Sequence, residues 1–476
     1  MNTPLSLLGQ LHTARVVGAL PTTWQRVHTD SRSVKPGDVF VALRGERFDG
    51  HDFLPQLPAL GVHAALAEHG LAQAGLAGVE VANSAAALGE WAGRWRAQCA
   101  ATRLIAVTGS NGKTTVTQMV AGMLRAAAPQ ACMATEGNFN NAIGVPLTLL
   151  RLQPTHAWAV VELGMNHPGE IAPLARMAQP QVALVNNAQR EHQEHMGSVD
   201  AVAEENAAVF DALPAHGVAV MPHDSPYTAG WTQRARAAAE SAAVWTFSSQ
   251  HPQATVYAAA QWLGQAWQLQ LHTPQGQARC MLAAPGIHSV HNALAAVACA
   301  LAAQVPWAAV QQGLESFEPV KGRGQRLRVA RAHGAPLTLV DDSYNANPDS
   351  VLAAIEVLAG LPAPRWLVLG DMGEVGQHSV AFHQEVLRCA CQAPLHRIDV
   401  VGEAMAQAHH TLTPSQRRRI HLHDSVETLQ QALTASHLDV ASALVKGSRF
   451  MRMERVVQRI EQLGAAPRTP ESSHVA

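Results

Sequence analysis

A glycine-rich loop set between an apolar segment and a helical one constrains this chain more than any other feature. Residues 104–107, Leu-Ile-Ala-Val, predict a buried strand, and residues 108–115 continue with Thr-Gly-Ser-Asn-Gly-Lys-Thr-Thr. Beyond the loop, apolar residues recur at helical spacing from Val116 to Leu124. A strand, a glycine-rich loop and a helix in this order open a doubly wound α/β domain, which binds ligands at the carboxyl ends of its parallel strands.

The loop is a compressed relative of the phosphate-binding loop GxxxxGK[ST]. In that spacing the first glycine would fall at residue 107, which is valine, whereas here it stands at 109. The chemistry still fits, because backbone N–H groups and a helix N-terminus attract phosphate, a lysine reaches the outer phosphates and a threonine can bind Mg²⁺. The alternative is a strand–turn–helix junction with a chance Gly-Lys pair, but the flanking strand and helix favour phosphate binding. The nucleotide-binding candidates are Thr108, Gly109, Ser110, Asn111, Gly112, Lys113, Thr114 and Thr115.

Two further polar residues follow neighbouring predicted strands. Glu162 ends the apolar segment 156–162, and His192 lies shortly after the segment 181–187. Carboxylate and imidazole groups at adjacent strand ends are placed to hold Mg²⁺ beside a nucleotide. The alternatives are a capping or salt-bridged glutamate and a surface histidine. We expect a metal site made by Thr114, Glu162 and His192.

Strand and helix patterns alternate along most of the chain. Helices are expected from Ser84, which would cap the first of them, and over residues 199–213 and 290–303. A basic, glycine-bearing connector at 317–324 separates this unit from a second α/β unit. The strands of the second unit are expected at 337–340, 365–369, 397–401 and 443–445, and the tail at 464–476 is expected to be disordered.

Composition excludes several classes of protein. The 476 residues carry 34 Lys and Arg against 36 Asp and Glu, a net charge of −2, which argues against DNA or an anionic membrane as a partner. The longest apolar run, 293–303, is too short to span a membrane, and no signal peptide opens the chain. Six cysteines without a CxxC indicate reduced thiols. We expect a cytoplasmic protein that is not membrane-embedded and binds no nucleic acid.

Together these motifs resemble the Mur ligase family, the ATP-dependent amide-forming enzymes of peptidoglycan precursor synthesis. The resemblance runs from about residue 25 to about residue 460. It rests on the loop, Glu162, His192, the GxHxxxN element that ends at Asn292, Gly322-Arg323 and the stretch DDSYNANP at 341–348. Within the family, GNFNNAIG at 137–144, LGDMGE at 369–374 and KGSR at 446–449 point to the branch that adds D-alanyl-D-alanine to UDP-N-acetylmuramoyl-tripeptide.

The resemblance implies three α/β domains and a monomeric enzyme. A UDP-substrate-binding domain would occupy residues 1–84, a central ATPase with a mostly parallel sheet residues 85–317, and a Rossmann-like ligase domain residues 318–463. It also implies that the γ-phosphoryl group of ATP passes, with Mg²⁺, to the tripeptide carboxylate, and that the D-alanyl-D-alanine amine then attacks the acyl phosphate.

The same resemblance assigns roles to particular residues. Lys113, Glu162, His192 and Arg323 become the catalytic candidates, while Asn292 would face adenine and Asp342 would bind the ribose. The plainer alternatives are a hinge role for Arg323 and a turn-forming role for Asp342. The substrate-binding candidates are Ser31, Arg32, Asn138, Asn140, Asn141, Tyr344, Asn345 and Asn347.

In two places the sequence departs from the family pattern. Ser289 stands where an asparagine is common, which leaves Asn292 alone to read adenine. Relatives carry a carbamylated lysine 14 residues after the metal-binding histidine, and that position here is Asn206. We expect Asn206 to lie near a second Mg²⁺, with Glu205 as the less favoured substitute; the alternative is that substrate phosphate and His192 hold this ion. Activity should not depend on CO₂.

Other functions stay open at this point. Folylpolyglutamate synthase shares the ATPase core, but it begins near the phosphate loop, whereas about 100 residues precede the loop here. A nucleotide-dependent switch would carry NKxD for guanine, and the diaminopimelate-adding relative would carry DNPR. Neither motif occurs in the sequence.

Overall fold

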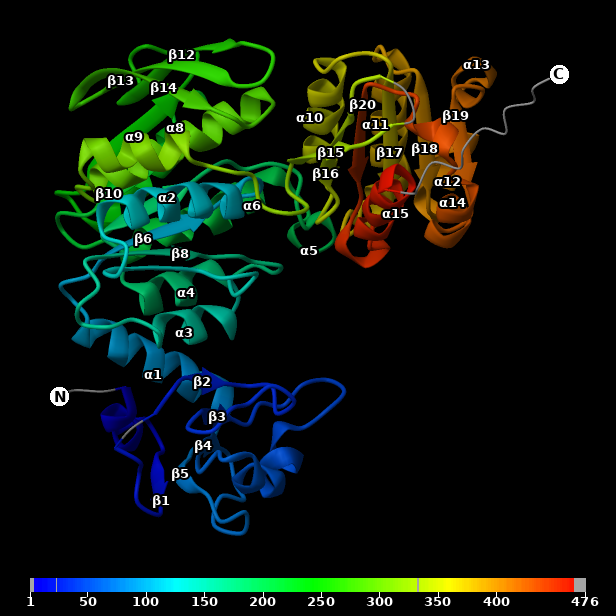
Figure 1. Ribbon diagram of the computed structural model, residues 1–476. Coiled ribbons are helices and arrows are strands. Elements are labelled where there is room, and N and C mark those ends of the chain that lie inside the picture. The colour runs from blue at the N-terminus through cyan, green and yellow to red at the C-terminus, as the bar shows by residue number, and fades with distance from the viewer. Residues whose placement is uncertain (1–3, 23, 332–333, 466–476) are drawn as a thin grey trace.

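The computed structural model describes residues 4–22, 24–331 and 334–465. Within these residues the strands form three sheets with helices packed against them, and the chain passes through the sheets in order (Figure 1). Most neighbouring strands are parallel, so the mixed α/β architecture predicted from the alternating pattern is confirmed. The N-terminal sheet spans residues 15–80, the central sheet 103–282 and the C-terminal sheet 325–446. We propose domain boundaries close to residues 84 and 318.

The N-terminal unit is built on a small sheet with strand order β1-β5-β4-β3-β2, parallel except at β1. Its strands are β1 Arg15–Val17, β2 Val27–His28, β3 Val39–Val41, β4 Ala64–Ala67 and β5 Ala77–Glu80. Its 3-10 helices are η1 Pro4–Gln10, η2 Gly50–Gln56 and η3 Pro58–Leu60.

Helix α1, Ser84–Gln98, ties this unit to the central one (Figure 1). The indole of Trp91 donates to Pro4 O at 2.7 Å, and the indole of Trp95 donates to Leu152 O at 2.9 Å. The helix is capped by Asn83 rather than by Ser84 as expected, because the Asn83 side chain accepts the Ala86 N–H at 2.8 Å.

The central sheet has the order β14-β13-β12-β11-β10-β9-β6-β8-β7. Its strands are β6 Arg103–Thr108, β7 Cys132–Ala134, β8 Trp158–Glu162, β9 Val182–Val185, β10 Val218–Pro222, β11 Ala243–Ser248, β12 Val256–Trp262, β13 Trp267–Thr273 and β14 Gly276–Leu282. The strands from β7 to β12 are parallel, whereas β12, β13 and β14 form an antiparallel edge that the sequence patterns did not reveal.

Helices cover both faces of the central sheet. Alternate residues of β6 point to opposite faces, so Leu104 and Ala106 share a core with α1, α3, α4 and α6, while Ile105 and Val107 share one with α2, α8 and α9. The predicted helix at 199–213 ends early and continues as the 3-10 turn η4. The helical elements are α2 Lys113–Ala127, α3 Gly144–Leu149, α4 Ile171–Ala178, α5 Gln193–Met196, α6 Val199–Ala207, η4 Ala208–Ala212, α7 Thr228–Ala238, α8 Ile287–Ala302 and α9 Trp307–Glu315.

The C-terminal sheet has the order β15-β16-β20-β17-β18-β19 and is parallel except at β15. Its strands are β15 Gln325–Val329, β16 Leu337–Asp342, β17 Arg365–Gly370, β18 Arg397–Val401, β19 Ile420–His423 and β20 Ser442–Lys446. The helical elements are α10 Pro348–Ala359, η5 Gly376–His378, α11 Ser379–Gln392, α12 Glu403–His410, α13 Pro414–Arg417, α14 Val426–Ala432, η6 Ala435–Leu438, η7 Arg449–Met451 and α15 Glu454–Ala465.

The start of the predicted disordered tail is helical, since α15 includes Gly464 and Ala465; the rest of that tail, 466–476, lies outside the described residues. No helix in the described ranges is long and apolar enough to cross a membrane. The six cysteines are free thiols, and burial raises the pKa of each, which keeps them protonated and unreactive.

Candidate functional site

A cavity of about 1710 Å³ lies between the central and C-terminal units, at the carboxyl ends of strands from both sheets. Its walls therefore combine residues that are more than 200 positions apart in the sequence. The predicted site residues that line it are Ser110, Asn111, Gly112, Lys113, Thr114, Thr115, Asn138, Asn140, Asn141, Glu162, His192, Asn292, Arg323, Asp342, Tyr344, Asn345 and Asn347.

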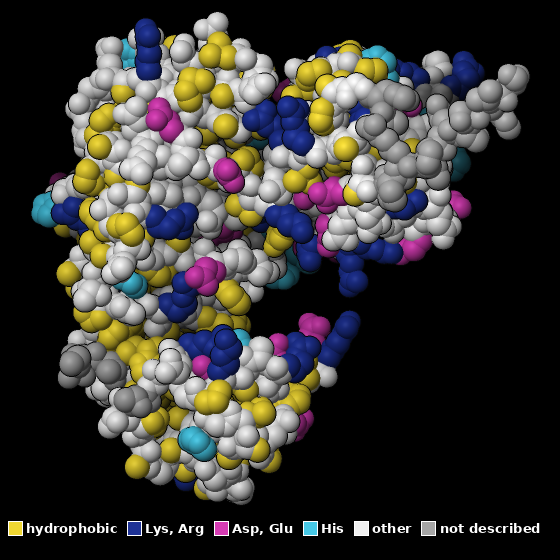
Figure 2. All heavy atoms as spheres, viewed as in Figure 1, with side chains coloured by type: hydrophobic (Ala, Val, Ile, Leu, Met, Phe, Trp, Pro, Cys, Tyr) yellow, Lys and Arg dark blue, Asp and Glu magenta, His cyan; other side chains and the backbone are white. Residues whose placement is uncertain are grey.

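Four predicted site residues do not line this cavity. Thr108 is fully buried below the loop, where its hydroxyl donates to Asn206, and Gly109 lies beside it. Ser31 and Arg32 belong to the N-terminal unit, and Arg32 pairs with Asp30 at 2.7 Å. Figure 2 shows a deep gap between this unit and the C-terminal one, with Lys and Arg side chains on both sides.

Two positions of the loop require glycine, because of their backbone conformation and because neighbouring atoms lie very close. Gly109 and Gly112 have φ of 125° and 83°, which side chains rarely tolerate. A Cβ on Gly109 would lie 2.9 Å from Asn186 N, and one on Gly112 would lie 2.3 Å from Asn292 Oδ1. The structure therefore places Asn292 directly against the phosphate loop; its predicted contact with adenine stays a prediction.

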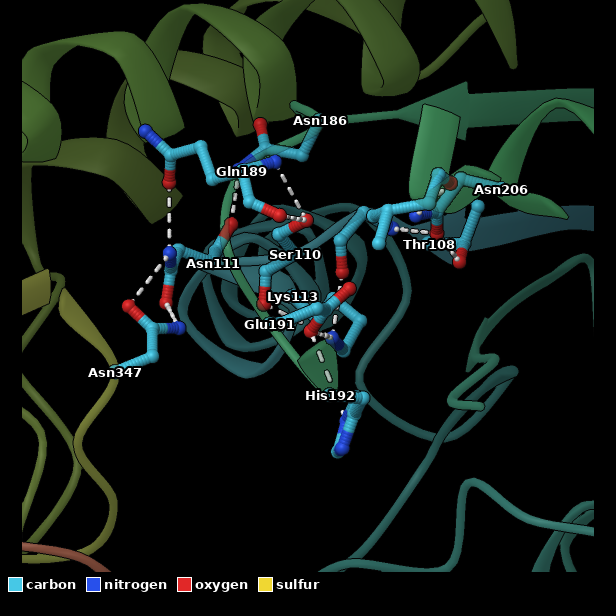
Figure 3. A network of polar contacts seen from close by, with 12 residues as sticks. Thr108, Ser110, Asn111, Lys113, Asn186, Gln189, Glu191, His192, Asn206 and Asn347 are labelled. Atoms are coloured by element: carbon cyan, nitrogen blue, oxygen red, sulfur yellow. Dashed lines mark hydrogen bonds and ion pairs between the residues drawn. The ribbon is translucent and has the colours of Figure 1, made fainter. Parts of the chain in front are cut away.

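A polar segment after β9 holds the loop in shape (Figure 3). Asn187 Oδ1 accepts the Asn111 N–H at 2.8 Å, and Asn187 O accepts the Ser110 N–H at 3.1 Å. Asn186 Nδ2 donates to Asn111 O at 2.8 Å and to Asn292 Oδ1 at 2.9 Å. These bonds fix the loop backbone before any ligand binds.

Lys113 lies over the loop with its ammonium group already engaged. Its Nζ donates to Gly109 O at 2.5 Å, to Ser110 O at 3.0 Å and to Glu191 Oε2 at 3.1 Å (Figure 3). These three acceptors match the three protons of the ammonium group. A phosphate that binds this loop must therefore draw Lys113 away from at least one of them.

Glu162 stands at the end of β8 with one free oxygen. Its Oε1 accepts from Asn140 Nδ2 at 2.7 Å, and its backbone N–H donates to Thr135 Oγ1 at 2.9 Å. Its Oε2 is buried and has no hydrogen-bond partner among the described residues. A buried carboxylate oxygen without a partner is costly, and a cation would satisfy it. The nearby Asn141 serves the backbone instead, since its Oδ1 accepts the N–H groups of Ile143 and Gly144.

His192 reaches the C-terminal unit. It has a left-handed backbone, with φ of 47°, at the start of α5. Its Nδ1 lies 2.6 Å from Glu374 Oε2 in the loop after β17. Contact with the His192 imidazole, together with the charges of His195 and His167, lowers the pKa of the Glu374 carboxyl. In this structure the predicted metal ligand is therefore also a contact between units.

Residues of the C-terminal unit also line the cavity. The Arg323 guanidinium lies 4.1 Å from the centre of the Tyr344 ring, a cation–π contact. Lys446 Nζ donates to Asp342 Oδ2 at 2.7 Å and to Asn345 O at 2.8 Å, across the paired strands β16 and β20. These contacts orient Arg323 and Asp342 toward the space above the phosphate loop, which both residues line.

Asn347 joins the C-terminal unit to the phosphate loop. It caps α10 by accepting the Ser350 N–H at 2.9 Å, and its Nδ2 donates to Asn111 Oδ1 at 2.9 Å. The sequence suggested substrate contact for this residue. The observed bonds give it a structural task at the junction of the two units, and because it also lines the cavity its predicted substrate contact stays a prediction.

Comparisons with known proteins agree along the whole chain. Residues 24–96 match the Mur ligase family catalytic domain, residues 107–300 the Mur ligase middle domain and residues 323–449 the glutamate ligase domain of Mur ligases. The UDP-N-acetylmuramoyl-tripeptide–D-alanyl-D-alanine ligase of Escherichia coli K12 is 37% identical over 462 residues, which cover 97% of this chain and 98% of that one. The chain belongs to the Mur ligase family.

Solved structures place this Mur ligase among its relatives. A crystal structure of MurF from Acinetobacter baumannii superposes with a TM-score of 0.85 at 34% identity, covering 96% of this chain and 98% of that one. Folylpolyglutamate synthase from Mycobacterium tuberculosis shares the fold with a TM-score of 0.62 at 18% identity, covering 79% of this chain and 94% of that one. The folylpolyglutamate alternative is therefore the more distant likeness.

The structure corrects the expectation for Asn206 in this ligase. Asn206 is fully buried; its Oδ1 accepts from Thr108 Oγ1 at 2.6 Å and from Gly109 N at 2.8 Å, and its Nδ2 donates to Val202 O. The amide supports the base of the loop and has no oxygen to offer a cation. Glu205 is no substitute, because its carboxylate accepts backbone N–H groups ahead of α4. Independence from CO₂ stays a prediction.

Ser289 also has a structural task. Its hydroxyl donates to Pro285 O at 2.6 Å in the first turn of α8, and the residue is buried. This bond explains why a small hydroxyl side chain fits here, where the family pattern has an asparagine.

Sequence reasoning missed the residues that meet the predicted ones across the fold. Asn186, Asn187 and Glu191 contact the loop and Lys113, and Glu374 contacts His192. The signal for the first three was the polar run directly after an apolar strand at 182–185. Glu374 ends the motif LGDMGE at 369–374, but nothing in the sequence paired it with His192, because its partner lies in another unit.

Proposed function

We propose that this Mur ligase joins D-alanyl-D-alanine to UDP-N-acetylmuramoyl-tripeptide with ATP, releasing ADP and phosphate, as a step of peptidoglycan precursor synthesis. The observation that carries this proposal is the joint lining of one cavity by a phosphate loop, the carboxylate of Glu162 and the Arg323–Asp342 region. The named relative that matches almost the whole chain gives the proposal its substrates.

The chain's part in the chemistry is positioning and neutralisation of charge. The N-terminus of α2 faces the phosphates in this proposal, since the N–H groups of Gly109, Ser110 and Asn111 are bonded within the protein, and Lys113 adds a positive charge near the group in transfer. The tripeptide carboxylate takes the γ-phosphoryl group, giving an acyl phosphate. The dipeptide amine then attacks the acyl carbon, and phosphate leaves from the tetrahedral intermediate.

The free Oε2 of Glu162 fits Mg²⁺, and we propose Thr114, Glu162 and His192 as the residues that hold it. When bound, Mg²⁺ neutralises phosphate charge and orients the triphosphate. His192 can take part through Nε2 while Nδ1 keeps its contact with Glu374, so metal binding and the position of the C-terminal unit are linked in this proposal.

In this proposal the remaining candidate residues bind either the nucleotide or the amide substrates. We propose that Arg323 contacts phosphate, that Asp342 contacts ribose and that Asn292 reads adenine. For the tripeptide end and the dipeptide we propose the cavity-lining residues Asn138, Asn140, Asn141, Tyr344, Asn345 and Asn347. Ser31 and Arg32 would bind the UDP moiety from the N-terminal unit. We also propose that the protein acts as a monomer in the cytoplasm.

The decisive experiment measures phosphate release by the full chain with ATP, Mg²⁺ and combinations of substrates. We expect release only when UDP-N-acetylmuramoyl-tripeptide and D-alanyl-D-alanine are both present, with a stoichiometric pentapeptide product by mass spectrometry. Release that depends instead on a folate and glutamate, or that ignores both amide substrates, would overturn the proposal.

A further inference from the structure

Glu191 is a buried carboxylate that the mechanism above leaves without a role. It lies between the loop segment after β9 and the start of α5, is 6% exposed, and lines the cavity. Its Oε2 accepts from Lys113 at 3.1 Å (Figure 3). Its Oε1 is buried and has no hydrogen-bond partner in the described part of the chain.

The pairing of Glu191 with Lys113 belongs to the site before nucleotide binds. A triphosphate on the loop offers Lys113 oxygen acceptors with more negative charge than one carboxylate. When Lys113 turns to phosphate, Glu191 loses its counter-ion while it stays buried. An unpaired buried carboxylate is strongly unfavourable, so another cation must replace the lysine or the exchange does not occur.

The neighbourhood of Glu191 suits a hard divalent cation. His192 Nε2 lies 3.9 Å from Glu191 Oε2, so a carboxylate and an imidazole face the same space. Among the described residues no three His, Cys, Asp or Glu side chains are close enough to form a metal site by themselves. Mg²⁺ does not need such a group of three, because it takes one or two carboxylates and fills its other positions with phosphate oxygens and water.

We propose that Glu191 exchanges cations: it pairs with Lys113 in the ligand-free site and coordinates a divalent cation once nucleotide is bound. The proposal rests on the proposed function only in requiring that ATP binds this loop. Because Asn206 is neutral and its oxygen is occupied, Glu191 supplies negative charge that Asn206 does not. The free Oε1 is the first atom available to the cation.

The test titrates Mn²⁺ into the full chain with a non-hydrolysable ATP analogue and follows unbound Mn²⁺ by electron paramagnetic resonance. Glu191→Gln keeps the shape but removes the charge, so it should weaken binding of one Mn²⁺ at least about tenfold. Glu194→Gln is the matched control, since Glu194 is exposed on the same segment and does not line the cavity. It should bind Mn²⁺ like the wild type.

A second measurement separates this role from that of a simple counter-ion. In EDTA, without metal, the analogue should bind Glu191→Gln at least as well as the wild type, because Lys113 no longer has to leave a carboxylate in order to reach phosphate. Unchanged Mn²⁺ affinity in Glu191→Gln would overturn the proposal and leave Glu191 as the counter-ion of Lys113. If that variant melts early, Glu191→Ala also removes the carboxylate and should show the same loss of Mn²⁺ affinity; wild-type affinity there would also overturn the proposal.

Failure of the proposal for Glu191 can be distinguished from failure of the proposed function. Absence of pentapeptide product with the wild type would reject the substrates, while Mn²⁺ binding with the ATP analogue would still report on Glu191.

Discussion

At the scale of single residues, the proposed function gives Lys113 the charge on which phosphoryl transfer depends. Its ammonium group is held over the loop by two carbonyl oxygens and Glu191. Lys113→Ala should lower kcat by about 10²–10³-fold or more, because one preorganised positive donor is lost from the transition state. Phosphate release measures the loss, and circular dichroism checks the fold. Near-normal turnover in a folded variant would contradict the assigned role.

Because the Asn206 amide is bonded to the base of the loop, we expect this residue to contribute to stability. Asn206→Leu is similar in size but leaves the Thr108 hydroxyl and the Gly109 N–H without their buried acceptor. Each unsatisfied group costs about 1–3 kcal/mol, so the free energy of unfolding should fall by at least that amount in urea titrations. Glu204→Ala, at an exposed position on the same helix, should stay within about 0.5 kcal/mol of wild type. Equal stability of Asn206→Leu and the control would refute the supporting role.

At the scale of elements, Asp399 joins three neighbouring strands of the C-terminal sheet. It lies on β18, where it accepts from Trp366 Nε1 on β17 at 2.7 Å, contacts His423 Nε2 on β19 at 2.8 Å and pairs with Arg397. Burial alone would raise the pKa of Asp399, but the hydrogen bonds from His423, Arg397 and Trp366 outweigh it and lower the pKa to about 2.

A carboxylate with a lowered pKa stabilises the fold above its unfolded-state pKa of 3.8 and loses this effect as the pH falls toward about 2. Asp399→Asn should therefore lower the free energy of unfolding by about 2 kcal/mol at pH 7. The difference from wild type should shrink as the pH drops through that window. Urea titrations at pH 7, 4 and 3 measure it; a difference that grows on acidification would reject the linkage.

At the scale of the whole molecule, Arg190 clamps the C-terminal unit to the central one. From the loop after β9 it pairs with Asp349 of α10 at 2.6 Å and with Glu385 of α11 at 2.7 Å. Arg190→Met should weaken docking by about 1.5 kcal/mol, roughly tenfold in the docked-to-undocked ratio. X-ray scattering without ligands should give a larger radius of gyration. Arg234→Met, which removes similar pairs within the central unit, should leave the radius unchanged.

The N-terminal unit must also move for all predicted site residues to meet. Ser31 and Arg32 do not line the cavity that holds Lys113, Glu162, Arg323 and Asp342, and a gap separates their unit from the C-terminal one (Figure 2). Scattering with an ATP analogue and UDP-N-acetylmuramoyl-tripeptide should show compaction relative to the free chain, because in the proposed site each ligand contacts residues of two units. Identical profiles in an active preparation would exclude closure.

The sequence alone determined the features that depend on neighbours along the chain. The strand before the loop, the glycines at 109 and 112 and the helix from Lys113 are local patterns, and the structure contains each of them. Glu162 was predictable for the same reason, since a polar residue directly after an apolar strand marks the ligand-binding edge of a parallel sheet.

The tertiary structure decided which side chains face one another. Asn206 lies 14 positions after His192, yet its amide turns below the loop to Thr108, so spacing alone gave it the wrong partner. Glu191 meets Lys113 from 78 positions away, and Asn347 meets Asn111 from 236 positions away. Such contacts depend on how sheets and helices stack and on how whole units dock. Both the stacking and the docking are set by contacts between residues that are far apart in the sequence, and no local sequence pattern encodes such contacts.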